Sequence, residues 1–138
     1  MTTQYASQTL ITALTQSPEI LRKVRTEFNN VVAKDFEIKN KSTAEILQEA
    51  VNLESICKLD YLSYISSETL RMQSPTQLSS FFYFMKDMKV GNLNVRKGDE
   101  FSIYLQGLHL NTNEWQKPHE FIPERFDSSN PINLTPSG

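Results

Sequence analysis

Glu68 and Arg71 are the residues whose types and spacing bear most directly on chemistry in this sequence. At a spacing of three positions on a predicted helix, the two side chains lie on one side and can form an ion pair. Glu68 shares its helix face with Ile65 and Met72, so its carboxylate needs a partner, and a guanidinium is the best available. Taken alone, the pair is equally consistent with a solvated surface ion pair, which contributes little to stability.

A second arginine, Arg125, lies between two aromatic residues in the segment Phe121–Phe126. This segment is irregular and proline-containing, so it could fold back onto the Glu68–Arg71 pair. An acid held by two arginines would lock a helix to a coil in one register, because each buried charge becomes costly when a partner leaves.

The other candidate nucleophiles and metal ligands form no recognisable site. Cys57 is the only cysteine, which excludes an internal disulfide and a cysteine-based zinc site, and we expect it to be a buried or half-buried small residue. His109 and His119 lack a carboxylate spacing that indicates a metal site. Motifs of serine hydrolases, phosphate-binding loops and dinucleotide-binding folds are absent from the sequence.

The composition argues against two classes of partner. The formal net charge is -2, and no run of Lys or Arg stands out, so nothing favours nucleic acid or an anionic membrane surface. No apolar stretch approaches the roughly 20 residues of a membrane span, so we predict no membrane segment in this chain.

Hydrophobic periodicity predicts helices in the first half of the chain. We expect them at residues 2–15, from Pro18 to about Val32, after a capping box at Ser42–Glu45 and over Leu59–Met72. Ser17 is a candidate N-cap with proline at the first helical position, and Ser74-Pro75 ends the last helix.

Shorter alternations after residue 74 predict strands. We expect strands at 81–85, 88–90, 93–95 and 100–105, with a hairpin turn at Gly91-Asn92; in the last strand Phe101, Ile103 and Leu105 alternate with polar residues. The fold class is therefore mainly α with a small β-sheet (α+β), in a single partial domain. Its parts are a helical part (1–73), a β-sheet part (74–110) and a coil (111–138), and we expect Trp115, Phe121 and Phe126 to pin this coil to the body of the molecule.

Several motifs together resemble the cytochrome P-450 family of haem-thiolate monooxygenases. Glu68-Thr69-Leu70-Arg71 is similar to the Glu-x-x-Arg of the family's K helix, and Phe121–Phe126 is similar to the Phe-x-Pro-Glu-Arg-Phe segment of its meander. Lys97-Gly98, Leu108-His109, Trp115 and Pro118 fall between them in the family's order. Leu14–Val24 resembles the junction of the I and J helices. The likeness covers nearly the whole chain and implies a partial cytochrome P-450 fold.

The resemblance implies roles for four residues. Glu68, Arg71 and Arg125 would form the family's charged triad, which is structural and holds the core near the haem. Thr2 aligns with the threonine that assists oxygen activation in the complete enzyme, although at this position it could equally be an ordinary N-capping residue. A complete relative would bind haem b, accept electrons from a reductase and insert one oxygen atom of dioxygen into a lipophilic substrate. A complete eukaryotic relative would reside in the endoplasmic reticulum membrane.

Two departures from the family pattern shape the functional prediction. Cys57 precedes the K-helix motif and lacks a glycine-rich loop, so it is not the axial ligand, and the sequence holds no cysteine after the meander. In addition, Phe82 stands where the family commonly supplies an arginine to a haem propionate, and no basic residue lies between Ser74 and Lys86. We therefore predict a monooxygenase fragment that binds no haem and is inactive alone. The alternatives are a non-catalytic α+β interaction module and a truncated gene product.

Overall fold

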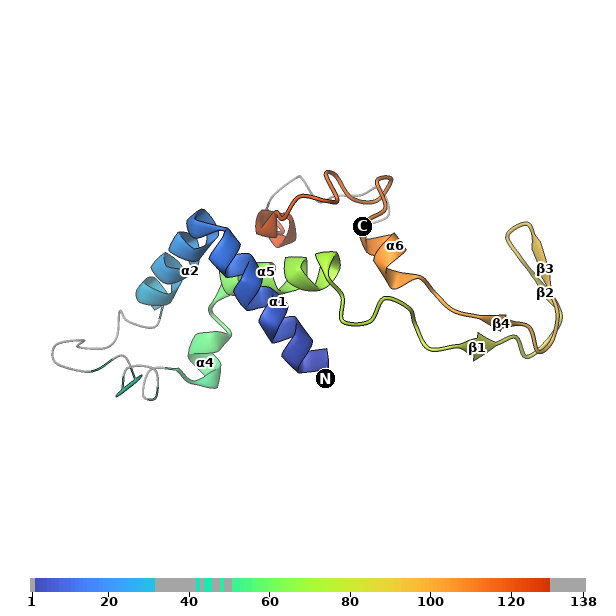
Figure 1. The fold of residues 1–138 in the computed structure, drawn as a ribbon, viewed down its shortest axis with the longest axis horizontal. Helices are drawn as coiled ribbons and strands as arrows, with labels where there is room; N and C mark the ends of the chain where they lie inside the picture. Colours follow the sequence, from blue (N-terminus) through green and yellow to red (C-terminus); the bar gives the residue numbers. More distant parts are fainter. Residues whose placement is uncertain (1, 32–41, 43, 46–47, 49–50, 130–138) are drawn as a thin grey trace.

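The fold is α+β, as the sequence predicts, with helices first and short strands after them (Figure 1). A computed structural model describes residues 2–31, 42, 44–45, 48 and 51–129. The elements are α1 (Thr2–Gln16), α2 (Pro18–Val31), α4 (Leu53–Ile56), α5 (Asp60–Met72), β1 (Phe82–Tyr83), β2 (Met88–Val90), β3 (Leu93–Val95), β4 (Glu100–Phe101), α6 (Leu105–His109) and the 3-10 turn η1 (Pro123–Phe126).

The first two helices form as predicted and pack on α5. Ser17 separates them, and its carbonyl accepts a hydrogen bond from the Leu21 N–H at 3.0 Å. Pro18 opens α2, where its missing N–H costs nothing because the first turn has no intrahelical acceptor. Both helices contact α5, so α5 is enclosed from two sides. Val32, the predicted end of the apolar stripe, lies outside the described residues.

Two capping boxes mark the next helical starts. Ser42 and Glu45 form the predicted one: the Ser42 N–H donates to Glu45 Oε2 at 2.7 Å, and the Glu45 N–H donates to Ser42 Oγ at 3.3 Å. The inward residues Ile46, Leu47 and Ala50 of that predicted helix lie outside the described residues. A second box, with Asn52 as the N-cap and Ser55 at its third position, begins α4, a helix that periodicity did not predict because it has four residues.

A carboxylate from another helix caps α5. The N-cap residue Leu59 makes no side-chain hydrogen bond to the helix. Instead, Glu27 of α2 accepts hydrogen bonds from the N–H groups of Tyr61 (2.6 Å) and Leu62 (3.1 Å). These N–H groups would otherwise lack an acceptor, and the helix dipole favours a negative charge there. The helix ends before Ser74-Pro75, so the predicted range of 59–72 is confirmed to within one residue.

The apolar packing of the helical part is small. Leu59 is 8% exposed and contacts four half-buried residues, which are Phe28, Val31, Val51 and Leu62. Ile65, one turn before Glu68 on α5, is fully buried. Among the described residues, no helix is both long and apolar enough to cross a bilayer.

Residues 78–104 form an extended antiparallel arm, which we call the β-arm (Figure 1). β1 pairs with β4 through Phe82↔Phe101, and β2 pairs with β3 through Met88↔Val95. The predicted hairpin is confirmed, and Gly91 supplies the positive φ of 57° at its turn. The predicted strand at 81–85 is shorter than expected, since only Phe82–Tyr83 is paired as a strand.

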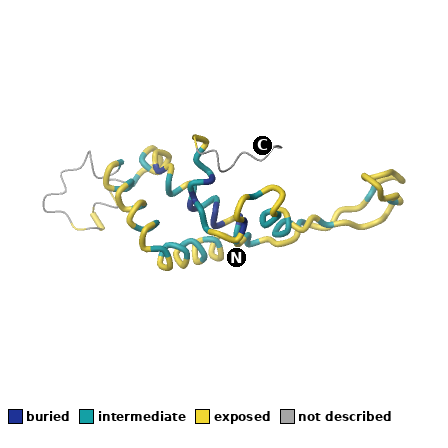
Figure 2. The backbone as a smooth tube through the Cα atoms, turned by 90° about the horizontal axis from the view of Figure 1, so that it is seen from above, coloured by how far each residue is buried: buried dark blue, intermediate teal, exposed yellow. Residues whose placement is uncertain are grey.

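The prediction of a strand through residue 105 was wrong beyond Phe101. Phe101 and Ile103 are 37% and 43% exposed, and Leu105 begins α6. The ladder stops at a bridge between Leu78 and Tyr104. Gln106 then ties the chain to the end of α5, because its side-chain Nε2 donates to the Met72 carbonyl at 2.8 Å. With no second layer over the β-arm among the described residues, alternation did not lead to burial (Figure 2).

Candidate functional site: a buried carboxylate between two arginines

Glu68 lies at the centre of a closed charged cluster. The Arg71 guanidinium binds it with two hydrogen bonds, Nε to Oε2 at 2.7 Å and Nη2 to Oε1 at 2.9 Å. Arg125 donates from Nε to Oε1 at 3.0 Å. Glu68, Arg71 and Arg125, which we call the triad, are 0%, 3% and 2% exposed. A solvated surface pair is therefore excluded for Glu68 and Arg71.

Local structure explains how the triad comes together. Helix α5 places Glu68 and Arg71 on one side at a spacing of three. Arg125 lies in η1, which begins at Pro123, and the N–H of Ile122 just before it donates to Glu68 Oε1 at 2.9 Å. Glu68 thus holds both the side chain and the backbone of the incoming segment, although 57 positions separate it from Arg125.

Arg71 also holds the coil that leads to η1, residues 110–122, which we call the C-terminal coil. Arg71 Nη1 donates to the carbonyl of Pro118 and to that of His109, just before the coil, both at 2.8 Å. Arg71 Nη2 donates to the Glu120 carbonyl at 3.4 Å. With its two bonds to Glu68, all five N–H donors of Arg71 have acceptors. An irregular coil cannot pair its own buried carbonyls, so the guanidinium replaces the missing secondary structure.

Arg125 likewise binds backbone carbonyls in the middle of the C-terminal coil. Its Nη1 donates to the Gln116 carbonyl at 3.0 Å, and its Nη2 donates to the Lys117 carbonyl at 3.2 Å. Lys117 has a φ of 48°, a left-handed conformation that costs a residue with a side chain about 1–2 kcal/mol. The bond from Arg125 to its carbonyl helps to keep the chain in that conformation.

Trp115 covers the two guanidinium groups. Its ring centroid lies 5.1 Å from the Arg71 guanidinium carbon and 5.8 Å from that of Arg125, within cation–π range. Its indole N–H donates to the Leu108 carbonyl at 3.2 Å, and Phe126 packs beside it at 6.2 Å between ring centroids. The sequence predicted that Trp115 pins the coil, but not that it does so over the triad.

The geometry suits a structural role better than a chemical one. Both oxygens of Glu68 already accept hydrogen bonds, four in all when the one from Ile122 is included. No face of the carboxylate reaches solvent, so it has no free position for a substrate or a water. Removing one partner of such a pair leaves an uncompensated buried charge, which typically costs about 3–5 kcal/mol.

The other residues singled out in the sequence lie apart from the triad. Thr2 begins α1, and the structure does not describe its side chain. Cys57 is exposed, which corrects the prediction that it is buried or half-buried; it follows the four-residue α4, which buries none of its own residues. His119 is exposed, whereas His109 is half-buried and its Nδ1 has no hydrogen-bond partner. No group of three or more His, Cys, Asp or Glu side chains in the described part could hold a metal ion.

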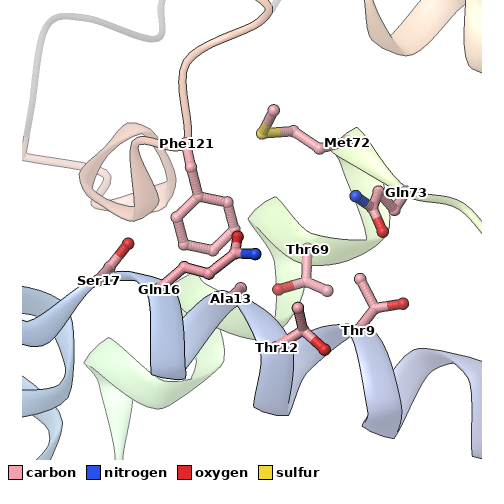
Figure 3. Close-up of a pocket in the computed structure, with 9 residues that line it drawn as sticks. All are labelled: Thr9, Thr12, Ala13, Gln16, Ser17, Thr69, Met72, Gln73 and Phe121. Carbon is pink, nitrogen blue, oxygen red and sulfur yellow. The ribbon is translucent and has the colours of Figure 1, made fainter.

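A small cavity lies between α1, α5 and the C-terminal coil (Figure 3). Its volume is about 150 Å³, and Thr9, Thr12, Ala13, Gln16, Ser17, Thr69, Met72, Gln73 and Phe121 line it. The hydroxyls of Thr12 and Thr69 donate to backbone carbonyls of their own helices, which occupies their protons. Pockets for drug-sized ligands measure about 300–1,000 Å³, so this cavity is too small to be a substrate site.

Comparison with known proteins places these features in a family. The family model "Cytochrome P450" matches residues 1–137. Cytochrome P450 82A1 of Pisum sativum is 33% identical over 116 residues, covering 84% of this chain and 19% of the relative. Ent-kaurene oxidase of Salvia miltiorrhiza is 35% identical over 78 residues, which cover 56% of this chain and 15% of the relative. Isoflavone 3'-hydroxylase of Medicago truncatula is 28% identical over 124 residues, which cover 90% of this chain and 22% of the relative.

A solved structure shares the fold. A zebrafish cytochrome P450 solved with progesterone superimposes with a TM-score of 0.76 at 22% identity, covering 92% of this chain and 27% of that one. The chain spans between 15% and 22% of the length of the three plant relatives named above. The match to the family model extends over almost every residue, and the chain therefore belongs to the cytochrome P450 family.

Proposed function

We propose that this chain is a segment of a haem-thiolate monooxygenase in which the triad joins the helix α5 to the C-terminal coil. The observation that carries the proposal is the closed contact of Glu68 with both arginines, each nearly inaccessible to solvent. Such a cluster fixes one register between two segments and has no free group for catalysis. Because the chain belongs to a family of monooxygenases, we propose that activity for the complete enzyme.

The complete enzyme would insert one atom of dioxygen into a lipophilic small molecule, with electrons supplied by a reductase. Relatives named for oxidation of ent-kaurene and for hydroxylation of isoflavones support this substrate class. Thr2 would assist oxygen activation in the complete enzyme, and a eukaryotic enzyme of this family would reside in the endoplasmic reticulum membrane. In the complete enzyme, this chain would form a single partial domain. That domain would consist of a helical part (1–73), a β-sheet part (74–110) and a coil (111–138).

The residues of this chain do not fit haem ligation by themselves. A haem thiolate needs a cysteine as axial ligand, and Cys57, the only cysteine in the sequence, is exposed at the end of α4. Nor do the described residues include a cluster of side chains that could hold a metal ion. We therefore assign no step of the reaction to this chain in isolation and propose that it is catalytically silent alone; the role of Thr2 would apply only in the complete enzyme.

A spectroscopic experiment tests the proposed silence. The purified chain would be mixed with haem, reduced, and exposed to carbon monoxide. We expect no thiolate-type Soret band, because no cysteine is positioned to bind the iron. A thiolate-type band that disappears in Cys57→Ser would contradict both the inactivity and the exclusion of Cys57.

A chimera tests the family role of the triad. Residues 1–137 would replace the matching segment of the Pisum sativum relative, which supplies the rest of the fold. We expect a thiolate-type carbon monoxide spectrum from this chimera and its loss in the Glu68→Gln version. Glu120→Gln is the matched control, because Glu120 is an exposed carboxylate in the same coil. If the Glu68→Gln chimera keeps the full spectrum, the triad does not hold the haem-binding fold together.

The alternative of a non-catalytic interaction module rests on the exposed apolar side chains of the β-arm. Phe81, Met85 and Leu93 are 64%, 82% and 69% exposed, which is unusual for residues of their size. A chimera that yields no haem spectrum while the isolated chain binds another protein through the β-arm would favour the module. A truncated gene product would show neither property.

A further inference from the structure

Glu124, the residue before Arg125, belongs to a second polar cluster that spans three elements. Its Oε1 accepts a hydrogen bond from Lys23 Nζ of α2 at 2.6 Å and one from the Tyr61 hydroxyl of α5 at 3.0 Å. Lys23 also lies over the Tyr61 ring, 5.5 Å from its centroid. Two successive residues of η1 therefore bind two separate clusters, Arg125 the triad and Glu124 this one.

The two attachment points lie on one face of α5. Tyr61 and Glu68 are seven positions apart, close to two full turns, so their side chains project in nearly the same direction. At about 1.5 Å per residue, the two points are roughly 10 Å apart along the helix axis. One attachment would leave η1 free to rotate about it, whereas two separated attachments fix its direction across α5.

We infer that Glu124 is a positioning residue that sets the orientation of η1 on α5, so that the neighbouring Arg125 guanidinium meets Glu68. The inference rests on the structural role proposed for the triad and adds residues to it that sequence reasoning did not single out. Lys23 extends the attachment to α2, which also caps α5 through Glu27. The helix α2, the helix α5 and the turn η1 are thereby joined at one place.

The ionised form of Glu124 is the one that serves this purpose, since it accepts from both partners. Partial burial of Glu124 opposes ionisation, but hydrogen bonds from Lys23, from its own backbone N–H and from Tyr61 outweigh it and hold its pKa below 4.5. Burial and the hydrogen bond to Glu124 raise the pKa of Tyr61, with smaller contributions from the charges of Glu19 and Glu27, so its hydroxyl keeps its proton as the donor.

Proton exchange at the two arginines tests the inference in the full chain. The Nε–H groups of Arg71 and Arg125 both donate to Glu68, so Arg71 is an internal reference. We expect Glu124→Gln to accelerate exchange of the Arg125 Nε–H by about tenfold, the effect of losing one hydrogen bond to a charged group, while that of Arg71 is unchanged. Glu120→Gln should accelerate neither.

Equal acceleration at both arginines would show a general loss of stability, and no acceleration would show that Glu124 does not orient η1; either result overturns the inference. Should Glu124→Gln not fold, Tyr61→Phe and Lys23→Met remove one hydrogen bond each and carry the same expectation for Arg125. Lys23→Arg keeps the charge and should restore slow exchange, and failure of this rescue would also count against the inference. The measurement uses neither haem nor activity, so it is independent of the chimera.

The pH dependence of the same exchange gives a second readout. Because the pKa of Glu124 is lowered on folding, its contribution is present above the ordinary pKa of 4.5 and is lost as the pH falls through the lower folded value. The protection of the Arg125 Nε–H, measured relative to free arginine at the same pH, should fall in that acid range in the native sequence. In Glu124→Gln the step should be absent, and its persistence would assign it to another carboxylate and overturn the role of Glu124.

Discussion

The triad region buries charged side chains, whereas the β-arm exposes apolar ones. Four of the eight buried residues in the described part are polar or charged, namely Glu68, Thr69, Arg71 and Arg125. In the β-arm, large apolar side chains such as Met85 and Leu93 are exposed. The helical part therefore combines a buried, hydrogen-bonded charged cluster with a small apolar one, whereas the β-arm leaves its large apolar side chains in solvent.

The contrast shows which contacts are complete within these 138 residues. Every N–H donor of Arg71 has an acceptor in the chain, so the hydrogen bonds of this guanidinium are complete within these residues. The β-arm contacts no second layer within the described residues. Since the chain spans between 15% and 22% of the length of the three plant relatives, we infer that in a complete P450 fold other segments cover the β-arm.

The largest expected effect comes from breaking the triad at its centre. Glu68→Gln keeps the shape of the side chain but leaves two buried guanidinium groups without their counter-charge. We expect the free energy of unfolding of the helical part to fall by about 3–5 kcal/mol, measured by urea titration of the circular dichroism at 222 nm.

Two further variants make that measurement specific. Glu120→Gln removes a carboxylate that is 57% exposed in a surface pair, and it should leave the urea midpoint almost unchanged. The double variant Glu68→Gln/Arg125→Met should lose less than the sum of its single variants, because both remove the same contact. Strictly additive losses would mean that the two residues act independently.

The β-arm should respond in association rather than in stability. Replacing Phe81, Met85 and Leu93 with lysine removes exposed apolar surface and adds like charges along the β-arm. We expect less self-association in sedimentation velocity, with the urea midpoint of the helices unchanged. Lysines at the exposed α1 positions Gln4, Gln8 and Gln16 add the same charge and should not reduce association. If both sets act equally, net charge and not the β-arm drives association.

Local patterns in the sequence were enough to predict one main element in each region. The helix at 59–72 was predicted from its apolar stripe and from Ser74-Pro75, and the hairpin from the strand pattern around Gly91-Asn92. The predicted fold-back of Arg125 onto Glu68 also appears in the structure, because an acid and two arginines beside apolar positions leave few other arrangements.

Contacts that depend on the path of the backbone could not be predicted. The carbonyls that Arg71 binds belong to residues 109, 118 and 120, and nothing in the type of a residue tells where its carbonyl points. The cap that Glu27 places on α5 joins two helices, whereas capping patterns in a sequence are local. Alternation at Phe101 and Ile103 predicted a strand through residue 105, but strand pairing ends at Phe101, because a strand also needs a paired neighbour that alternation alone does not supply.

A smaller effect is expected from the cap that joins α2 to α5. Glu27→Ala removes the acceptor for the N–H groups of Tyr61 and Leu62, which should lower the free energy of unfolding by about 1 kcal/mol. Hydrogen exchange at those two amides should accelerate most. Glu19→Ala removes a carboxylate from the same helix that pairs only with exposed Arg22, and those two amides should not respond to it. Equal acceleration in both variants would exclude a capping role for Glu27.

The smallest expected effects come from one turn in each region, and they have opposite signs. The β-arm has glycine where φ is 57°, at Gly91, whereas the coil beside the triad has a lysine where φ is 48°, at Lys117. Gly91→Ala should destabilise the hairpin by about 1 kcal/mol, read from loss of NMR contacts between Met88 and Val95. Lys117→Asn should raise the free energy of unfolding by about 0.5 kcal/mol, because asparagine tolerates the left-handed region.

The stabilisation expected from Lys117→Asn can show whether Arg125 of the triad maintains the unfavourable turn at Lys117. Arg125 donates to the Lys117 carbonyl, so the cost of its conformation is offset by a hydrogen bond from a buried guanidinium. In an Arg125→Met background that bond is absent and the turn is free to relax, so Lys117→Asn should no longer stabilise the chain. If the gain persists there, the strain at Lys117 is independent of Arg125, and the coil keeps its path through Trp115 and Arg71 alone.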